Sequence, residues 1–395
     1  MAEWIECKIS DIGTVVGGAT PSTKKPENYE NGTIAWITPK DLSTFTGRYI
    51  QRGERNITEM GLKSCSTQLL PKDTVLFSSR APIGYVAIAT NEVCTNQGFK
   101  SVVPNENTDP LFLYYLLKYN KDKIEGMGSG TTFKEVSGNT MKNIVVSVPT
   151  DKKVQKRISS MLGSIDDKIE ENERINNNLL EQALTLYATQ FSSLELNGCI
   201  GDYCSVKSGF AFKSSWWTNS GIRVIKIGSI NQDNLNLLEC SYVDEDKADK
   251  AKDFVVKAGD LLIAMTGATI GKFAMVPYSS EMLLVNQRVG KFFLGNNPVE
   301  KLPFIYCTLK QPEVYGEVVN RGQGSAQPNI SASDIMSIPC VIPSQDAIND
   351  FNNTSQPLFD LIISNQRENQ HLSELRNALL PKLMSGELDV SDIEL

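Results

Sequence analysis

The chain has 395 residues, of which 41% are hydrophobic and 22% charged, as is typical of a globular protein large enough for at least two domains. It lacks an apolar run of the about 20 residues that cross a bilayer, and its first residues lack the pattern of a signal peptide, so we expect a cytoplasmic protein without a membrane segment. The net charge of −7 argues against a polyanionic partner. Residues 151–195 carry a net charge of −2, however, and residues 344–395 carry one of −6. The two larger segments are therefore near neutral and free to carry a basic face.

The cysteines and histidines do not form a metal-binding pattern. Eight cysteines are scattered without a C-x-x-C pair, and His371 is the single histidine. Structural zinc sites need closely spaced Cys and His ligands, so we expect no metal site. In a cytoplasmic protein the thiols are expected to stay reduced.

The chain contains one sequence pattern twice. Segment 71–77 returns at 258–264, the pair Asn96-Gln97 returns at 286–287, and the glycine-rich stretch 128–131 returns at 322–325. Both copies end on an apolar run followed by proline, at 148–149 and 342–343. Because the landmarks keep their order at offsets of 187 to 194, the sequence predicts two homologous domains, residues 1–150 and 196–343.

Each domain has a mixed α/β (α+β) pattern over about 145 residues. Short apolar runs predict strands at 74–77 and 144–148 in the first domain and at 261–264 and 338–342 in the second. Proline-opened segments predict short helices at 110–119 and 303–310. The order of the strands does not follow from these patterns.

Each domain is followed by a long segment with hardly any glycine or proline. Thr150 and Ser344 are good helix N-caps, and apolar residues then recur at alternating steps of four and three. This spacing predicts helices within 151–195 and 344–385 with a coiled-coil-like seam, and an acidic, solvated tail at 386–395. Pro357 predicts a kink or a broken first turn in the second helix.

Four asparagines, Asn172, Asn176, Asn365 and Asn369, interrupt the two seams at corresponding positions. In an antiparallel pair Asn172 faces Asn369 and Asn176 faces Asn365, whereas a parallel pair also matches asparagine with asparagine. The order domain, helix, domain, helix favours the antiparallel pair, because the second helix then returns to the first domain. Since a slip buries amides without partners, these residues are predicted to fix the register of a pseudo-two-fold molecule.

Several loops are rich in the side chains that read nucleic-acid bases and bind phosphates. Arg and Lys suit guanine, Asn and Gln suit adenine, and Lys, Arg and hydroxyl groups hold phosphate. Each of these side chains has a structural alternative as a turn-stabilising or ordinary surface residue. The candidate DNA contacts are Thr20, Ser22, Lys24, Lys40, Ser79, Arg80, Gln97, Ser129, Thr131, Thr132, Lys134, Lys213, Lys226, Ser229, Thr266, Thr269, Gln287, Arg288, Arg321, Gln323, Ser325, Gln327 and Asn329. In the aligned repeats Arg80 occupies the position of Gly267, and Arg288 that of Gly98, so the two domains are expected to read different bases.

No catalytic motif is found in the sequence. Segment 267–273 resembles a phosphate-binding loop, but it is one residue short and ends in Phe273 where Ser or Thr binds magnesium. The chain also lacks a Pro-Pro dipeptide, and with it the Asn/Asp-Pro-Pro-aromatic motif that methylates amino groups of bases. We therefore predict a protein without catalytic residues or a cofactor of its own.

The chain resembles the DNA-specificity subunits of Type I restriction-modification systems over essentially its whole length. The resemblance lies in the order of the landmarks above, the segment 128–134 and the ending Leu-Leu-Pro-Lys-Leu-Met-Ser-Gly-Glu-Leu at 379–388. It implies that each domain is a target-recognition domain for half of a bipartite double-stranded DNA sequence, and that the two helices act as spacers.

The resemblance also implies partner subunits. Two methyltransferase subunits would use S-adenosylmethionine to methylate adenine, and restriction or translocase subunits would use ATP and Mg²⁺. Two alternatives remain open from the residues alone: a two-headed scaffold for partners other than DNA, and an undetected nuclease.

Overall fold

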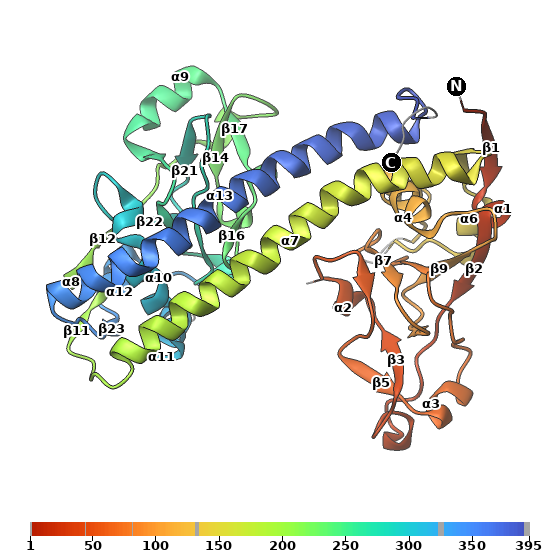
Figure 1. Cartoon of the computed structure of the whole chain (residues 1–395), viewed down its shortest axis with the longest axis horizontal. Helices are drawn as coiled ribbons and strands as arrows, with labels where there is room; N and C mark the ends of the chain where they lie inside the picture. Colours follow the sequence, from red (N-terminus) through yellow and green to blue (C-terminus); the bar gives the residue numbers. More distant parts are fainter. Residues whose placement is uncertain (1, 44, 81, 131–133, 323–327, 391–395) are drawn as a thin grey trace. The chain divides into compact units, whose positions relative to one another are not determined.

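The computed structural model of the chain describes residues 2–43, 45–80, 82–130, 134–322 and 328–390 (Figure 1). The chain forms two compact units: unit 1 is Met1–Asp167 with Glu374–Leu395, and unit 2 is Lys168–Ser373. Each unit contains one sequence repeat and part of both long helices, α7 (Lys152–Phe191) and α13 (Gln345–Met384). Among the described residues, no helix combines the length and the apolar character that a membrane crossing requires.

Unit 1 is built around a mixed sheet with the strand order β2-β9-β6-β7-β4. A second sheet has the order β5-β3-β8, and β1 pairs with β10. The strands are β1 (Trp4–Lys8), β2 (Gly13–Gly17), β3 (Ile34–Ile37), β4 (Tyr49–Ile50), β5 (Arg55–Ile57), β6 (Val75–Phe77), β7 (Val86–Ala89), β8 (Cys94–Thr95), β9 (Lys100–Pro104) and β10 (Val145–Pro149). The shorter helices are α1 (Ile9–Ile12), η1 (Pro26–Asn28), α2 (Pro39–Ser43), α3 (Glu59–Lys63), α4 (Pro110–Tyr119), α5 (Lys121–Gly126) and α6 (Gly138–Asn143).

The central strand of this sheet, β6, is fully buried on both faces. Val75 and Phe77 pack into one apolar cluster with α4 and both long helices, whereas Leu76 packs into a second cluster on the opposite face. Alternation of side chains along a strand explains this division, because neighbouring residues point to opposite faces. The predicted strand at 74–77 and the predicted helix at 110–119 are confirmed.

Unit 2 repeats this plan with different loops. Its sheets have the orders β12-β22-β19-β20 and β13-β17-β14-β21-β18, with the pairs β11-β23 and β15-β16 beside them. The strands are β11 (Gly198–Cys199), β12 (Ser205–Ser208), β13 (Trp217–Thr218), β14 (Ile222–Ile225), β15 (Ile230–Asn231), β16 (Asn234–Leu235), β17 (Ser241–Val243), β18 (Val255–Val256), β19 (Leu261–Ala264), β20 (Phe273–Met275), β21 (Leu283–Val285), β22 (Val289–Phe293) and β23 (Pro339–Cys340). The shorter helices are α8 (Ile200–Tyr203), η2 (Ser214–Trp216), η3 (Ile227–Ser229), η4 (Leu237–Glu239), α9 (Glu245–Ala248), η5 (Asp249–Phe254), η6 (Gly267–Thr269), η7 (Pro298–Glu300), α10 (Leu302–Leu309), α11 (Pro312–Gly322) and α12 (Ala332–Met336).

The backbone corrects the alignment of the two repeats by one residue. Asp73, with a φ of 68°, donates its N–H to the Ala89 carbonyl, and Gly259, with a φ of 80°, makes the corresponding bond to the Val276 carbonyl. Segment 71–77 therefore matches 257–263 and not 258–264. The sequence favoured the wrong register because it placed Asp73 on Asp260, whereas the turn requires a left-handed conformation, which glycine adopts without strain.

The same correction applies to the loops that follow. The N–H groups of Ser79 and Met265 donate to the carbonyls of Gly98 and Arg288, and their own carbonyls accept from Val136 and Ile330. Ser79 thus matches Met265, and Arg80 matches Thr266 instead of Gly267.

The long helices pair antiparallel within unit 2, as chain order favoured. The Asn172 amide donates to Asn369 Oδ1, and the Asn365 amide donates to Asn176 Oδ1, each at 2.8 Å. The parallel alternative is therefore wrong. At one end of this pairing the aromatic rings of Tyr187 and Phe191 on α7 contact Phe351 on α13.

The structure corrects two details, the broken turn at Pro357 and part of the solvated tail. Helix α13 continues through Pro357 without a broken turn; the buried Phe351 and Phe359 anchor it on both sides of the proline. The predicted solvated tail is wrong at Val390, which is buried in the apolar core of unit 1, whereas residues 387–389 are exposed as predicted.

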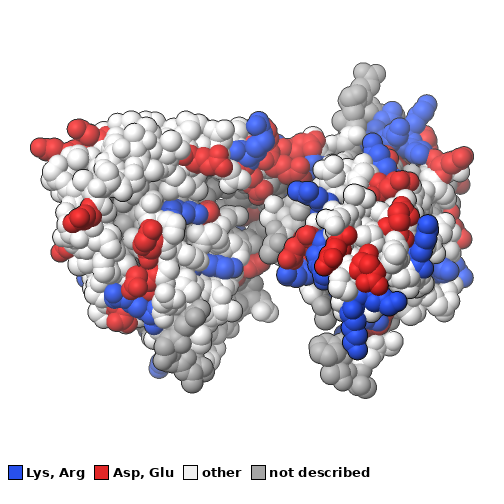
Figure 2. All heavy atoms as spheres, turned by 90° about the horizontal axis from the view of Figure 1, so that it is seen from below, with Lys and Arg blue, Asp and Glu red and all other residues white. Residues whose placement is uncertain are grey.

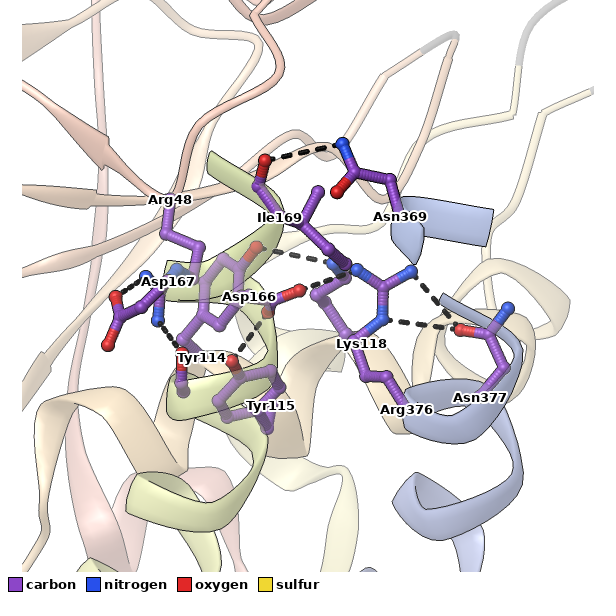
Figure 3. Close-up of polar contacts among 11 residues, drawn as sticks. Arg48, Tyr114, Tyr115, Lys118, Asp166, Asp167, Ile169, Asn369, Arg376 and Asn377 are labelled. Atoms are coloured by element: carbon purple, nitrogen blue, oxygen red, sulfur yellow. Dashed lines mark hydrogen bonds and ion pairs between the residues drawn. The ribbon is translucent and has the colours of Figure 1, made fainter. Parts of the chain in front are cut away.

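Within unit 1 a polar cluster holds both long helices against the first domain (Figure 3). Asp166 on α7 accepts hydrogen bonds from Tyr115 and from Arg376 on α13, each at 2.6 Å. Arg48, almost fully buried, donates to the Gly163 carbonyl at 3.2 Å and forms an ion pair with Asp167. These contacts connect the sheet, α4, α7 and α13 inside one unit.

Candidate nucleic-acid interface

In the first domain, three of the predicted loops meet at Lys100. The ammonium group of this residue lies 3.4 Å from Ser79 Oγ, 3.5 Å from the Gln97 carbonyl and 3.4 Å from the Glu135 carboxylate. The Thr20 hydroxyl in turn donates to the Gln97 side chain. The structure therefore brings loops that are far apart in sequence together around Lys100.

The glycine-rich loop of this domain is closed by reciprocal backbone bonds. Ser129 and Glu135 exchange N–H···O hydrogen bonds at 3.0 and 2.9 Å, and Arg80 Nε lies 3.0 Å from the Glu135 carboxylate. Burial alone would raise the pKa of Glu135, but the hydrogen bond and charge of Arg80, together with Lys100, outweigh it and lower that pKa. Glu135 is therefore a carboxylate between two cations at neutral pH.

Other predicted side chains of this domain lie on its exposed surface. Ser22, Lys24 and Lys134 are all exposed. Lys40 forms an exposed ion pair with Glu54 at 2.8 Å, beside a pocket of about 460 Å³. That pocket is lined by Trp36, Thr38, Lys40, Asp41, Glu54 and Arg55.

In the second domain, four predicted residues line one pocket of about 840 Å³. They are Thr266, Gln287, Arg288 and Asn329. An antiparallel bridge joins Thr266 to Asn329, and the Met265 N–H donates to the Arg288 carbonyl at 3.0 Å. Gln287 and Arg288 are exposed at the mouth, so they are available to a large ligand.

Two predicted lysines of this domain lie over tryptophan rings. Lys226 Nζ is 3.4 Å from the centre of the Trp217 ring, and Lys213 Nζ is 5.6 Å from that of Trp216. Such cation–π contacts hold a lysine without neutralising it. Burial lowers the pKa of Lys226.

Five predicted contacts are contradicted by the structure. Ser79 and Ser229 are fully buried, and their hydroxyl groups donate to the carbonyls of Gly98 and Glu239. The hydroxyl groups of Thr266 and Thr269 are buried as well. Arg321 is held by Glu317 and by the Ser337 hydroxyl at 2.6 Å, so its donors are occupied. These side chains support the loops, a role that residue type alone does not distinguish from DNA contact.

Five further predictions fall on residues outside the described part of the chain: Thr131, Thr132, Gln323, Ser325 and Gln327. The sequence reasoning also missed Lys100 and Glu135. Glu135 directly follows the predicted Lys134, but a carboxylate is not among the side chains that bind phosphate, so residue type alone does not point to it. A carboxylate can still act at such a site by orienting a cation.

On the side of the molecule drawn in Figure 2, basic and acidic side chains are interspersed on both units, so this side is not a uniformly basic face. All eight cysteines are free thiols, and the described residues contain no group of three His, Cys, Asp or Glu side chains placed to hold a metal ion.

Two copies of one α/β domain, each presenting polar and basic loops, together with a pair of long helices, define a class of two-domain recognition proteins. The chain belongs to the family described as Type I restriction modification DNA specificity domain, which matches residues 1–181 and 196–370. The family predicted from the sequence is thus confirmed.

Similar proteins agree with this assignment. The MjaIX specificity subunit of a Type I restriction enzyme from Methanocaldococcus jannaschii is 34% identical over 99% of this chain and 95% of its own length. The MjaVIII specificity subunit from the same organism is 19% identical over 99% of this chain and 94% of its own length. The crystal structure of a Type I restriction-modification S subunit from M. genitalium shares the fold, with a TM-score of 0.56 and 17% identity over 99% of this chain and 97% of that one.

Proposed function

We propose that this chain recognises a two-part DNA sequence, one part through each domain, as the specificity subunit of a Type I restriction-modification complex. One observation carries the proposal: the two domains hold equivalent loops in the same backbone frame but place different side chains on them. The backbone bonds of the frame match, whereas Arg80 stands against Thr266 and Gly98 against Arg288. Equivalent backbone loops that carry different side chains suit the recognition of two half-sites with different base sequences.

The chemistry of the complex belongs to partner subunits in this proposal. Two adenine methyltransferase subunits using S-adenosylmethionine, and restriction subunits using ATP and Mg²⁺, would assemble with this chain in the cytoplasm. The names of the relatives, which are specificity subunits of restriction enzymes, support this division of labour.

The test is the methylation pattern of DNA in cells that express the chain with its methyltransferase subunit. We expect adenine methylation at one bipartite sequence, and none when the chain is expressed alone. Exchanging residues 1–150 for those of a relative should change one half of the sequence and leave the other half intact. Methylation by the isolated chain, or a target unchanged by the exchange, contradicts the proposal.

The salt dependence of binding distinguishes DNA recognition from a scaffold for other partners. DNA binding weakens steeply with rising salt, because each neutralised phosphate releases counterions. Binding that is insensitive to salt contradicts DNA recognition by these loops.

A further inference from the structure

We propose that Arg80 reads a guanine in the half-site of the first domain, and that Glu135 is a positioning residue that holds Arg80 for this contact. This inference rests on the proposed DNA recognition and adds to it the identity of one base and the roles of two side chains.

The guanidinium group of Arg80 is held on one edge only. Arg80 Nε lies 3.0 Å from Glu135 Oε2. The side chain of Arg80 is 46% exposed and that of Glu135 is 35% exposed. No residue in the described ranges bonds the two terminal nitrogens of Arg80. Those nitrogens form a planar pair of donors that matches O6 and N7 of guanine in the major groove.

Glu135 is itself held in place, by Lys100 and by backbone hydrogen bonds. Lys100, whose side chain is only 14% exposed, lies 3.4 Å from the Glu135 carboxylate and is anchored on Ser79 and the Gln97 carbonyl. The backbone of Glu135 is pinned to Ser129 in both directions. Arginine loses considerable rotamer freedom when it is ordered, so an arginine that is oriented before binding discriminates at a lower entropic cost.

The second domain shows that the ion pair is not required to build the loop. The bridge between Arg80 and Glu135 has its equivalent in the bridge between Thr266 and Asn329, where both side chains are neutral. The same backbone closure therefore forms without charges. A carboxylate beside a phosphate-binding arginine would also repel the phosphate, so the pair suits a base edge better than the DNA backbone.

The test is selection of binding sites from a random duplex library by the full-length chain and its variants. The unmodified chain should select a motif with guanine in the half-site of the first domain. Arg80→Ala and Arg80→Lys should both lose the preference at that single base pair, with affinity for the motif falling about 5- to 100-fold. The salt dependence of binding should stay unchanged, whereas loss of a phosphate contact lowers its slope by about one.

The outcomes separate this inference from the proposed function. If the unmodified chain selects no motif, the proposed function fails and the inference with it. If it selects a motif but Arg80→Ala relaxes a position other than guanine, relaxes none, or weakens all sequences equally with a lower salt slope, only the inference fails. Arg174→Ala is the matched control, because Arg174 forms a similar ion pair with Glu171 on helix α7 and should leave the motif unchanged.

Glu135→Gln tests the positioning role. It should weaken the preference at the same base pair by less than Arg80→Ala does, and binding to unrelated DNA should rise because a negative charge is removed. A purely structural role predicts a lower melting temperature with the full guanine preference retained. That result overturns the assignment of Glu135.

Discussion

The two units hold the same pair of helices with different chemistry. At the sequence offset of 193 that aligns the helices, Asp166 and Arg376 in unit 1 stand where unit 2 has Phe359 and Ala183. Unit 1 closes this contact with a largely buried ion pair, whereas unit 2 has two fully buried apolar side chains there. Those two side chains lie in the same apolar cluster as the packed aromatic rings of Tyr187, Phe191, Phe304 and Phe351. Duplication thus preserved the backbone plan, while the means of stabilisation diverged, so each helix segment fits its own unit better than the other.

The largest effect is expected from the aromatic side of this comparison. Phe351 is fully buried among rings whose centres lie 5.6 Å away, so Phe351→Ala should lower the free energy of unfolding by about 3–5 kcal/mol. Chemical denaturation and hydrogen exchange should place this loss in unit 2. Leu361→Ala on the same helix is the control, because Leu361 is 45% exposed and should change stability little. Similar losses from both variants would contradict the packing argument.

The fold was predictable where the pattern is local or repeated. Helical periodicity and the four asparagines predicted the register, because amides in an apolar seam accept few arrangements, and the order of domains and helices along the chain favoured the antiparallel pair over the parallel one. Strand order was not predictable, since pairs such as β3 with β8 and β4 with β7 are parallel and join residues far apart in sequence. The ion pair of Asp166 and Arg376 was also missed, because a seam arginine has no visible partner until both helices are in place.

The candidate site was predictable in outline only. The repeat located the loops, and the structure brings Gln287, Arg288 and Asn329 together around one pocket. Ser79 and Ser229 were misassigned because burial of a hydroxyl depends on tertiary packing, which the sequence does not reveal. The position of Arg80 was misaligned because a one-residue shift leaves the hydrophobic pattern almost unchanged.

The next largest effect is expected at the ion pair of Asp166 and Arg376 in unit 1. Arg376→Met should lower stability by about 2–4 kcal/mol, because it leaves the buried Asp166 carboxylate with Tyr115 as its remaining side-chain partner. The double variant Asp166→Leu with Arg376→Met should recover most of the loss, since an apolar pair needs no compensation. The measurement is a double-mutant cycle by urea unfolding. Losses that simply add contradict a direct coupling of the two side chains.

Lys118 is expected to destabilise unit 1 at neutral pH. Burial, followed by the charge of Arg376, lowers the pKa of Lys118 from its ordinary value of 10.5 to about 8. The folded state therefore disfavours the charged form, and the penalty is fully present below pH 8 and is relieved as the pH rises from about 8 to about 10.5. Lys118→Met should raise stability by about 1–3 kcal/mol at pH 7.

The pH dependence separates this charge effect from better packing. The advantage of Lys118→Met should disappear above about pH 10.5, where Lys118 is neutral in both states of the unmodified chain. Unfolding by urea at a series of pH values measures it. An advantage that stays constant from pH 7 to pH 11 would show that the methionine acts through packing and not through charge. The exposed Lys153, changed to Met on helix α7, is the control and should show neither effect.

The smallest effect is expected where the two halves of the molecule are most alike, at the asparagine pairs. Asn176→Leu leaves the buried Asn365 amide without its 2.8 Å partner and should lower stability by about 1 kcal/mol, whereas Asn176→Leu with Asn365→Leu should restore or exceed the original stability. Urea unfolding of the single and double variants measures this coupling. Because the double variant removes the penalty for a slipped seam, its helices should tolerate a shifted register, which cysteine cross-linking at neighbouring seam positions would detect. A double variant that is no more stable than the singles and forms only the original cross-link would mean that register depends on the surrounding units rather than on the asparagines.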